Sequence, residues 1–430
     1  MKPINGARAV LSLLVALLLQ GAVFAAGEDG LVTAAPESVG ISSERLKRIH
    51  AFVQDLIDRD EIAGAVTLVA RRGRIVHLEA HGLRYREEKL PMQPDTIFHL
   101  MSMTKPIAAT ALMMLWEEGR FRLDDPIAKW IPTIATKHVQ VDAASGRLEP
   151  PVRPVTFRHV LTHTSGLPQL GGPFGFGNVP HGDQAPKTLW EALQRAEKAP
   201  LVSQPGEKFQ YPNSLDYVAL LVEKISGLTM DQFLRRRIFE PLGMRDTFYN
   251  IPPEKFSRVA AVYAPAGKGI ELFWKPQPQE PTTYFPGRVG LSGTATDYFR
   301  FAQMLLNGGE LNGRRLLGRM TVDLMLTNQI GDLPITVLGP GYGFGLGGAV
   351  LTNPAKSADA LSIGSYSWGG AYGTLFWIDP TEELTGVLMA QIYPPARSNI
   401  RPLWSVVVSQ AVIDHRSDQK PKVMGRKTPR

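Results

Sequence analysis

Hydrophobic positions early in the chain predict a helix followed by two paired strands. In residues 42–58, apolar side chains recur at helical spacing, and Ser42 or Ser43 can cap the start of the helix. Residues 63–70 and 74–80 are strand-like and are joined by a short Arg-Arg-Gly turn, which predicts a hairpin. The expected order at this end is therefore helix, strand, strand.

Apolar strands return near the C-terminus. Residues 374–378 and 384–391 predict two strands joined by a turn, and residues 400–412 predict an apolar helix that covers the sheet. Between the two ends the apolar spacing is mainly helical. Residues 123–167 predict short helices and turns, and the proline-dense residues 264–286 predict a loop.

One helix start carries candidate chemistry. An apolar helix is predicted from Pro106 to about Glu117, because proline is tolerated in a first helical turn. Ser102 and Lys105 are three residues apart across this turn, so their side chains are expected on one face. A serine hydroxyl becomes a nucleophile when a neighbouring base takes its proton, and a buried neutral amine can be that base.

The spacing of these two residues is weak support by itself. Ser417 and Lys420 repeat it in a polar, basic tail. A capping serine followed by a surface lysine is therefore the alternative for Ser102 and Lys105. The hydrophobic lead-in and the helix start favour catalysis.

A second candidate motif is Tyr211-Pro212-Asn213. Pro212 keeps Tyr211 out of helical conformation, so the phenol is expected in an extended segment just before the helix that starts near Leu215. An aromatic side chain packed under a helix start, with Asn213 or Ser214 as the cap, is the structural alternative.

The third candidate motif is Trp368-Gly369-Gly370, which precedes the strand at residues 374–378. Paired glycines weaken a strand unless another backbone must come close, as substrate docking beside a strand would require. A bulge at a sheet edge is the structural alternative.

Two histidines, His159 and His163, are four residues apart and in principle could share a metal ion. No His-Glu-x-x-His pattern and no third ligand lies near them in the sequence, and a glycine turn follows. Structural roles are therefore favoured, and the sequence predicts no metal site and no cofactor.

The composition describes a chain that can bury a large core. Its 430 residues are 44% hydrophobic and 20% charged, and the absence of cysteine excludes disulfides and thiolate chemistry. The formal net charge of +7 lies mostly at the ends, because residues 416–430 hold six lysines and arginines against one aspartate. Since the body of the chain is near neutral, nucleic-acid binding is not expected.

The first residues predict an export signal. Lys2 and Arg8 precede the apolar run Ala9 to Leu19, and small residues around Ala25 suit a signal peptidase. The run is too short for a convincing membrane span. We therefore expect a signal peptide at residues 1–25 and a periplasmic or secreted protein with no stable membrane span after cleavage. An uncleaved N-terminal anchor is the alternative.

The three motifs, in this order, resemble those of the serine hydrolases of the class C β-lactamase superfamily, and the third motif is most similar to that of the family VIII carboxylesterases. The likeness extends to residues 161–167, 240–244 and 305–309. It implies an α+β fold of the β-lactamase/transpeptidase type, an antiparallel sheet flanked by helices with an inserted helical region. The domains implied are a core of residues 26–122 and 335–415 and a mainly helical region of residues 123–334. The charge of residues 416–430 predicts a basic flexible tail.

The resemblance also implies roles for single residues. Ser102 would attack a carbonyl carbon, and Lys105 and Tyr211 together would accept its proton. The backbone N–H groups of Ser102 and Ala371 would form the oxyanion hole. The residues implied to bind substrate are Asn213, Trp368, Gly369 and Gly370.

One departure from the pattern bears on the substrate. Penicillin-processing relatives usually carry Lys-Thr-Gly at the third motif, where the cation meets a substrate carboxylate. Trp368 has no charge, which favours neutral esters, so the expected partner is a small-molecule ester or amide, with no nucleic acid.

The predicted function is a carboxylesterase that acts on small acyl groups through an acyl-serine. An amide or D-peptide hydrolase, a weak β-lactamase and a non-catalytic, penicillin-binding-like sensing module are the alternatives. An α/β-hydrolase is excluded because the chain has no Gly-x-Ser-x-Gly elbow.

Overall fold

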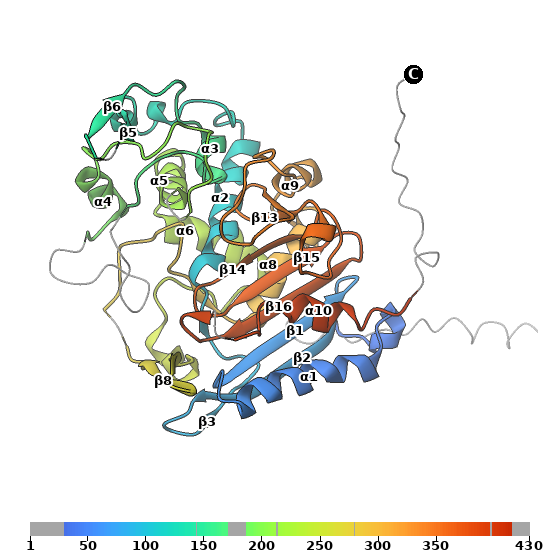
Figure 1. The fold of residues 1–430 in the computed structure, drawn as a ribbon. Helices are drawn as coiled ribbons and strands as arrows, with labels where there is room; N and C mark the ends of the chain where they lie inside the picture. Colours follow the sequence, from blue (N-terminus) through green and yellow to red (C-terminus); the bar gives the residue numbers. More distant parts are fainter. Residues whose placement is uncertain are drawn as a thin grey trace, which may run out of the picture.

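The computed structural model describes residues 30–142, 144–170, 186–211, 214–278, 280–395 and 398–414 (Figure 1). The predicted signal peptide and the predicted basic tail lie outside these ranges. Within them, no helix has both the length and the apolar character needed to cross a membrane.

An eight-stranded antiparallel sheet forms the centre of the molecule, in the order β12-β13-β14-β15-β16-β1-β2-β3. The N-terminal hairpin joins the C-terminal strands through the pairing of β1 with β16. This confirms the predicted α+β fold with its antiparallel sheet. The strands are β1 (Gly64–Arg71), β2 (Arg74–Tyr85), β3 (Leu90–Pro91), β12 (Tyr342–Phe344), β13 (Ala349–Leu351), β14 (Tyr366–Gly369), β15 (Leu375–Asp379) and β16 (Leu384–Ala390).

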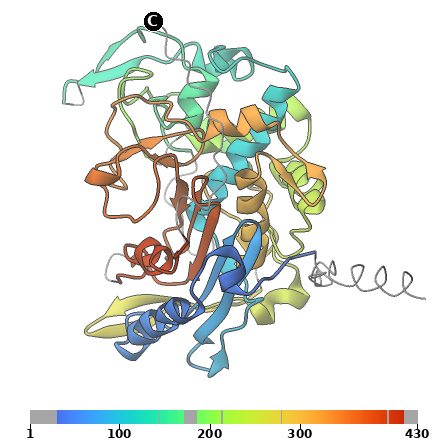
Figure 2. The same ribbon diagram turned by 90° about the vertical axis from the view of Figure 1, so that its right-hand side faces the viewer.

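Helices cover both faces of this sheet, as Figures 1 and 2 show. Successive side chains of a strand point to opposite faces, and every residue of β1 is buried. Val66 and Leu68 join the core that includes side chains of α2 (Thr104–Glu117) and α8 (Ala295–Leu306). Ala65 and Val69 join the core on the other face, which includes side chains of α1 (Ser43–Asp58) and α10 (Trp404–Ser409).

A mainly helical region packs on α2, chiefly through α5 (Figure 1). Residues 230–242 form α6, a π-helical turn (Arg235–Phe239) and α7 in succession. The boundaries expected between this region and the sheet domain stay predictions. The remaining helices are α3 (Phe157–Leu161), α4 (Leu189–Arg195), α5 (Leu215–Ser226), α6 (Met230–Leu234), α7 (Glu240–Leu242) and α9 (Arg319–Met325).

Two-stranded ribbons complete the described part of the chain and correct two predictions. They are β4 (Phe98–His99) with β9 (Ser292–Gly293), β5 (Val139–Asp142) with β6 (Arg147–Glu149), β7 (Val262–Ala266) with β8 (Gly269–Trp274), and β10 (Glu310–Leu311) with β11 (Arg314–Arg315). The β7–β8 ribbon occupies much of the predicted proline-dense loop. Pro265 is tolerated there because both strands of a ribbon are edges. The β5–β6 ribbon likewise interrupts the predicted short helices of residues 123–167.

The last predicted helix is shorter than expected. Apolar spacing predicted it over residues 400–412, whereas α10 covers Trp404–Ser409. The chain then leaves the helix to form an isolated antiparallel bridge between Val412 and Ile41. Pairing with the N-terminal segment therefore ends the helix before the apolar pattern does.

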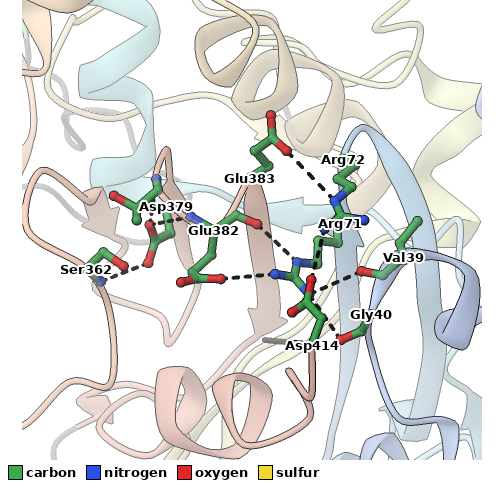
Figure 3. Close-up of polar contacts among 10 residues, drawn as sticks. Val39, Gly40, Arg71, Arg72, Ser362, Asp379, Glu382, Glu383 and Asp414 are labelled. Atoms are coloured by element: carbon green, nitrogen blue, oxygen red, sulfur yellow. Dashed lines mark hydrogen bonds and ion pairs between the residues drawn. The ribbon is translucent and has the colours of Figure 1, made fainter. Parts of the chain in front are cut away.

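Arg71, at the end of β1, is fully buried and ties the N- and C-terminal ends of the described chain to the sheet (Figure 3). Its guanidinium pairs with Glu382 at 3.0 Å and with Asp414 at 2.7 Å. It also donates to the carbonyls of Val39 at 3.1 Å and Gly40 at 3.0 Å. Since a buried charge is costly unless paired, this network holds the β15–β16 turn and both terminal segments in one arrangement.

Candidate active site

Ser102 lies in the single 3₁₀ turn η2 (Met101–Met103), directly before α2. Helix α2 begins at Thr104 rather than at the predicted Pro106, so Lys105 lies in its first turn. Met101 has φ of 50°, the left-handed region that strains a residue other than glycine. Backbone strain thus sits next to Ser102, which is 8% exposed.

The Ser102 hydroxyl contacts both of its predicted partners, Lys105 and Tyr211. Lys105 Nζ donates to Ser102 Oγ at 2.9 Å, and Tyr211 Oη donates to the same atom at 2.6 Å. Lys105 Nζ also lies 4.6 Å from the centroid of the Tyr211 ring. The structure therefore brings together the three residues predicted as catalytic, although 109 positions separate Ser102 from Tyr211.

A buried ion pair that the sequence analysis did not predict holds Lys105 in place. Lys105 Nζ donates to the backbone carbonyl of Arg288 at 2.8 Å. Arg288 Nε in turn pairs with Asp216, in the first turn of α5, at 2.8 Å, and both side chains are almost wholly buried. The only sequence signal for this pair was a charged residue amid the apolar start of α5.

Burial lowers the pKa of Lys105, which is fully buried. Tyr211 and the Asp216 carboxylate raise it in part, whereas the Arg288 guanidinium adds to the lowering. An ammonium loses most of its hydration in such a site, so the neutral amine is favoured relative to a lysine in water. A neutral amine can accept the serine proton.

Aromatic rings surround Tyr211. Its ring centroid lies 5.3 Å from that of Trp368 and 5.1 Å from that of His163, both in edge contacts. Trp368 is only 3% exposed, so it packs behind Tyr211 and offers little surface to a ligand. Asn213, predicted to bind substrate, lies outside the described residues.

The double glycine has a clear steric reason. A Cβ at Gly370 would lie 2.4 Å from the carbonyl oxygen of Leu100 and 2.2 Å from Thr374 Oγ1. The backbone that comes close is therefore that of the turn carrying Ser102. The sequence had predicted a docked substrate as the reason for the two glycines. Ala371 packs in the same small apolar cluster as Met101, and its N–H has no hydrogen-bond acceptor among the described residues.

A cation lies beside the third motif even though Trp368 lacks one. Arg401 Nη1 donates to the carbonyl of Gly370 at 3.2 Å. A Cβ at Gly369 would lie 2.4 Å from Arg401 Nη2. Burial lowers the Arg401 pKa, while Tyr211 opposes this effect. The sequence did not predict this contact, because Arg401 approaches from the segment before α10.

The two histidines considered as metal ligands have separate structural positions. His159 Nδ1 accepts a hydrogen bond from the backbone N–H of Thr156 at 3.2 Å and so helps cap α3. His163 is fully buried among the rings of Phe209, Tyr211 and Phe344. Burial, with Lys105 nearby, lowers the His163 pKa far below its usual value.

A buried serine that accepts hydrogen bonds from a lysine and a tyrosine, at the start of a helix beside an antiparallel sheet, defines the class of protein as a serine hydrolase. The family model described as Beta-lactamase matches residues 49–407. The chain belongs to this family, and its relatives include esterases.

Two relatives and one solved structure illustrate the likeness. Protein Rv1367c of Mycobacterium tuberculosis is 33% identical over 366 residues, covering 80% of this chain and 90% of that protein. Esterase EstB of Burkholderia gladioli is 33% identical over 365 residues, covering 80% and 89%. The structure of EstCE1, a hydrolase with promiscuous acyltransferase activity, matches with a TM-score of 0.72 at 27% identity, covering 86% of this chain and 99% of that one.

Proposed function

We propose that the protein is an exported carboxylesterase that hydrolyses esters of small acyl groups through an acyl-serine intermediate on Ser102. One observation carries the proposal: Ser102 Oγ accepts hydrogen bonds from both Lys105 Nζ and Tyr211 Oη. The similarity to Esterase EstB and to EstCE1 supports ester chemistry.

In the first half of the reaction, Ser102 Oγ attacks the ester carbonyl and its proton passes to the Lys105–Tyr211 pair. The negative charge on the carbonyl oxygen is stabilised by the backbone N–H groups of Ser102 and Ala371. Tyr211 then protonates the leaving alkoxide as the carbon–oxygen bond breaks.

In the second half, a water molecule attacks the acyl-serine, and the same pair accepts its proton. Ser102 Oγ leaves, recovers a proton, and the carboxylic acid is released. Burial of Lys105 supports this cycle, because a lowered pKa increases the fraction of neutral amine near neutral pH. Trp368 would hold the Tyr211 ring, and Asn213, Gly369 and Gly370 would border the acyl group.

A second candidate is an amide or D-peptide hydrolase with the same catalytic residues. Arg401 supports it, because a guanidinium beside Gly369 and Gly370 could attract a substrate carboxylate. The uncharged Trp368 and the bond from Arg401 to the Gly370 carbonyl support neutral esters instead.

Three substrates and one inhibitor test the proposal. We expect hydrolysis of p-nitrophenyl butyrate, with little turnover of nitrocefin or of a D-amino-acid amide. Activity confined to the amide would replace the ester assignment by the second candidate. A serine-directed phosphonate should add its mass to the peptide containing Ser102 and not in Ser102→Ala. A chain that takes up no label would be a non-catalytic binding module.

A further inference from the structure

Strand β2 places three titratable side chains on one face of the sheet, opposite the face that carries Ser102. His77, Glu79 and His81 alternate along β2, so their side chains point the same way. They pair in register with Val69, Thr67 and Ala65 of β1. Because Ala65 and Val69 belong to the core beneath α1, this is the face that α1 covers.

One residue of α1 completes a cluster there. His50 Nδ1 lies 2.6 Å from Glu79 Oε1, and His81 Nδ1 lies 3.8 Å from the same oxygen. One donor atom from each of the three residues falls within 4.8 Å of the other two. Tetrahedral zinc with nitrogen and oxygen ligands separates its donor atoms by about 3.3 Å, so small side-chain rotations bring the cluster to that geometry.

One ring nitrogen of His81 makes no hydrogen bond to the described residues. Its side chain is 1% exposed, and its Nδ1 has no hydrogen-bond partner in the described part of the chain. The other nitrogen, Nε2, lies 3.1 Å from Thr67 Oγ1, which lies 2.8 Å from His77 Nε2. If Nε2–H donates to the threonine and the threonine to His77, the Nδ1 lone pair of a neutral His81 points at the cluster.

This arrangement matches the outer shell of metal sites. A metal-bound histidine usually donates its second ring N–H to an oxygen, which fixes the tautomer and orients the ring. Thr67 supplies that oxygen for His81.

The cluster is open to solvent on one side. A cavity of about 490 Å³ is lined by His50, His77 and Glu79 among others. The side chains of His50 and Glu79 are 56% and 36% exposed, so an ion and a water ligand can reach them. Among the described residues that line this cavity, Lys47 is the one lysine or arginine. The Glu79 carboxylate offsets its positive charge.

We propose that His50, Glu79 and His81 form a zinc-binding site, with water as the fourth ligand. A site of two imidazoles and one carboxylate binds Zn²⁺ in preference to Mg²⁺ or Ca²⁺, because those two ions take oxygen ligands. The ion replaces the hydrogen bond between His50 and Glu79 and links helix α1 to strand β2. Since the cluster lies across the sheet from Ser102, the site stabilises the fold without entering the reaction.

Zinc binding by the full-length protein, purified without a histidine tag and stripped with EDTA, tests the proposal. Competition with a chromophoric zinc indicator should give one equivalent of Zn²⁺ per chain. His50→Gln and Glu79→Gln should each weaken binding more than tenfold, because each removes a direct ligand. Zinc X-ray absorption should show two imidazole ligands in the unaltered protein.

The matched control is His138→Gln, which removes an exposed histidine outside the cluster and should bind zinc like the unaltered chain. Both ligand variants change partly exposed side chains, and circular dichroism verifies that they fold. They should also keep full ester hydrolysis. Binding of equal strength in His50→Gln and the unaltered chain, or no stoichiometric zinc in the unaltered chain, would overturn the proposal while leaving the esterase proposal intact.

Discussion

Lys105 is a single residue whose environment sets the proposed chemistry. Its amine has lost all contact with bulk water and instead donates to Ser102 Oγ and to the Arg288 carbonyl. The same burial that would be costly for a charged lysine favours the neutral form that can act as a base. The buried site that holds the Lys105 amine next to Ser102 therefore also favours the neutral form of that amine.

Replacing this lysine should abolish most activity without abolishing the fold. Lys105→Ala removes the base, and kcat/KM for p-nitrophenyl butyrate should fall by about 10²–10⁴-fold. Lys137→Ala is the matched control, because Lys137 is also buried and its Nζ donates to three backbone carbonyls of residues 196–199. The control should lose stability but keep kcat/KM per folded molecule; an equal loss of activity in both would contradict the assignment.

The charge of Asp216 should be visible in the pH profile. Its carboxylate raises the Lys105 pKa, so Asp216→Asn should lower that pKa further. Activity requires the neutral amine, whose fraction grows as pH rises through the pKa, and the ascending limb of kcat/KM should therefore move to lower pH. The measurement is kcat/KM for p-nitrophenyl butyrate across the pH range in which the variant stays folded. A limb that stays in place would show that Lys105 does not sense this carboxylate.

At the scale of elements, the active site depends on how closely the end of β14 approaches the turn before α2. Thr374 Oγ1 donates to the Leu100 carbonyl at 3.2 Å, and Gly370 N–H donates to the Thr374 carbonyl at 2.8 Å. These bonds join the third motif to the turn that carries Ser102. The proposed oxyanion hole needs N–H groups from both elements, so its geometry depends on this junction.

Gly370→Ala tests the junction. The new methyl group would lie 2.4 Å from the Leu100 oxygen, closer than packed atoms allow, so the two elements must separate. We expect kcat to fall by at least tenfold with a smaller change in KM, because the displaced donors stabilise the transition state. Gly318→Ala, whose methyl group would meet chiefly the carboxylate end of the Glu117 side chain at 3.1 Å and no backbone atom, serves as the control. Normal kcat in Gly370→Ala would show that the close approach is not needed.

At the scale of the whole molecule, several histidines are held neutral inside the fold. Burial lowers the pKa of His77, His99 and His159 to about 4, from 6.5. Between pH 6.5 and about 4 the unfolded chain binds protons at these positions that the folded chain does not. The contribution of these histidines to the free energy of unfolding should therefore be fully present above pH 6.5 and be lost as the pH falls toward 4.

His99 is a convenient test, since its ring is buried and packs edge-on against Trp274. A fall in pKa from 6.5 to about 4 corresponds to roughly 3 kcal/mol of unfolding free energy lost at low pH. His99→Gln cannot titrate, so its unfolding free energy should change less between pH 7 and pH 5. Urea unfolding of both proteins at each pH gives the comparison, and parallel pH dependences would contradict the assignment.

Patterns within short stretches of sequence were sufficient to predict many helices and strands. They also predicted that Ser102 and Lys105 lie together in the candidate site. The hairpin of β1 and β2, the helices α1 and α2 and the strands β15 and β16 follow from apolar periodicity and turn residues. Ser102 and Lys105 come together because three residues span less than one helical turn. The missed ribbons, β5–β6 and β7–β8, are short, and β7 contains a proline that only an edge position permits.

What the sequence alone determined is therefore what neighbours along the chain can decide: the pattern of helices and strands, the nucleophile beside its lysine, and a resemblance to serine hydrolases carried by short motifs. Tertiary structure alone decided the contacts of Tyr211, Arg288, Asp216 and Arg401 around Ser102, and of His50 with Glu79 and His81 on the opposite face. These contacts join residues far apart in sequence, and which ones meet depends on sheet order and helix packing, a property of the whole core and of no single segment.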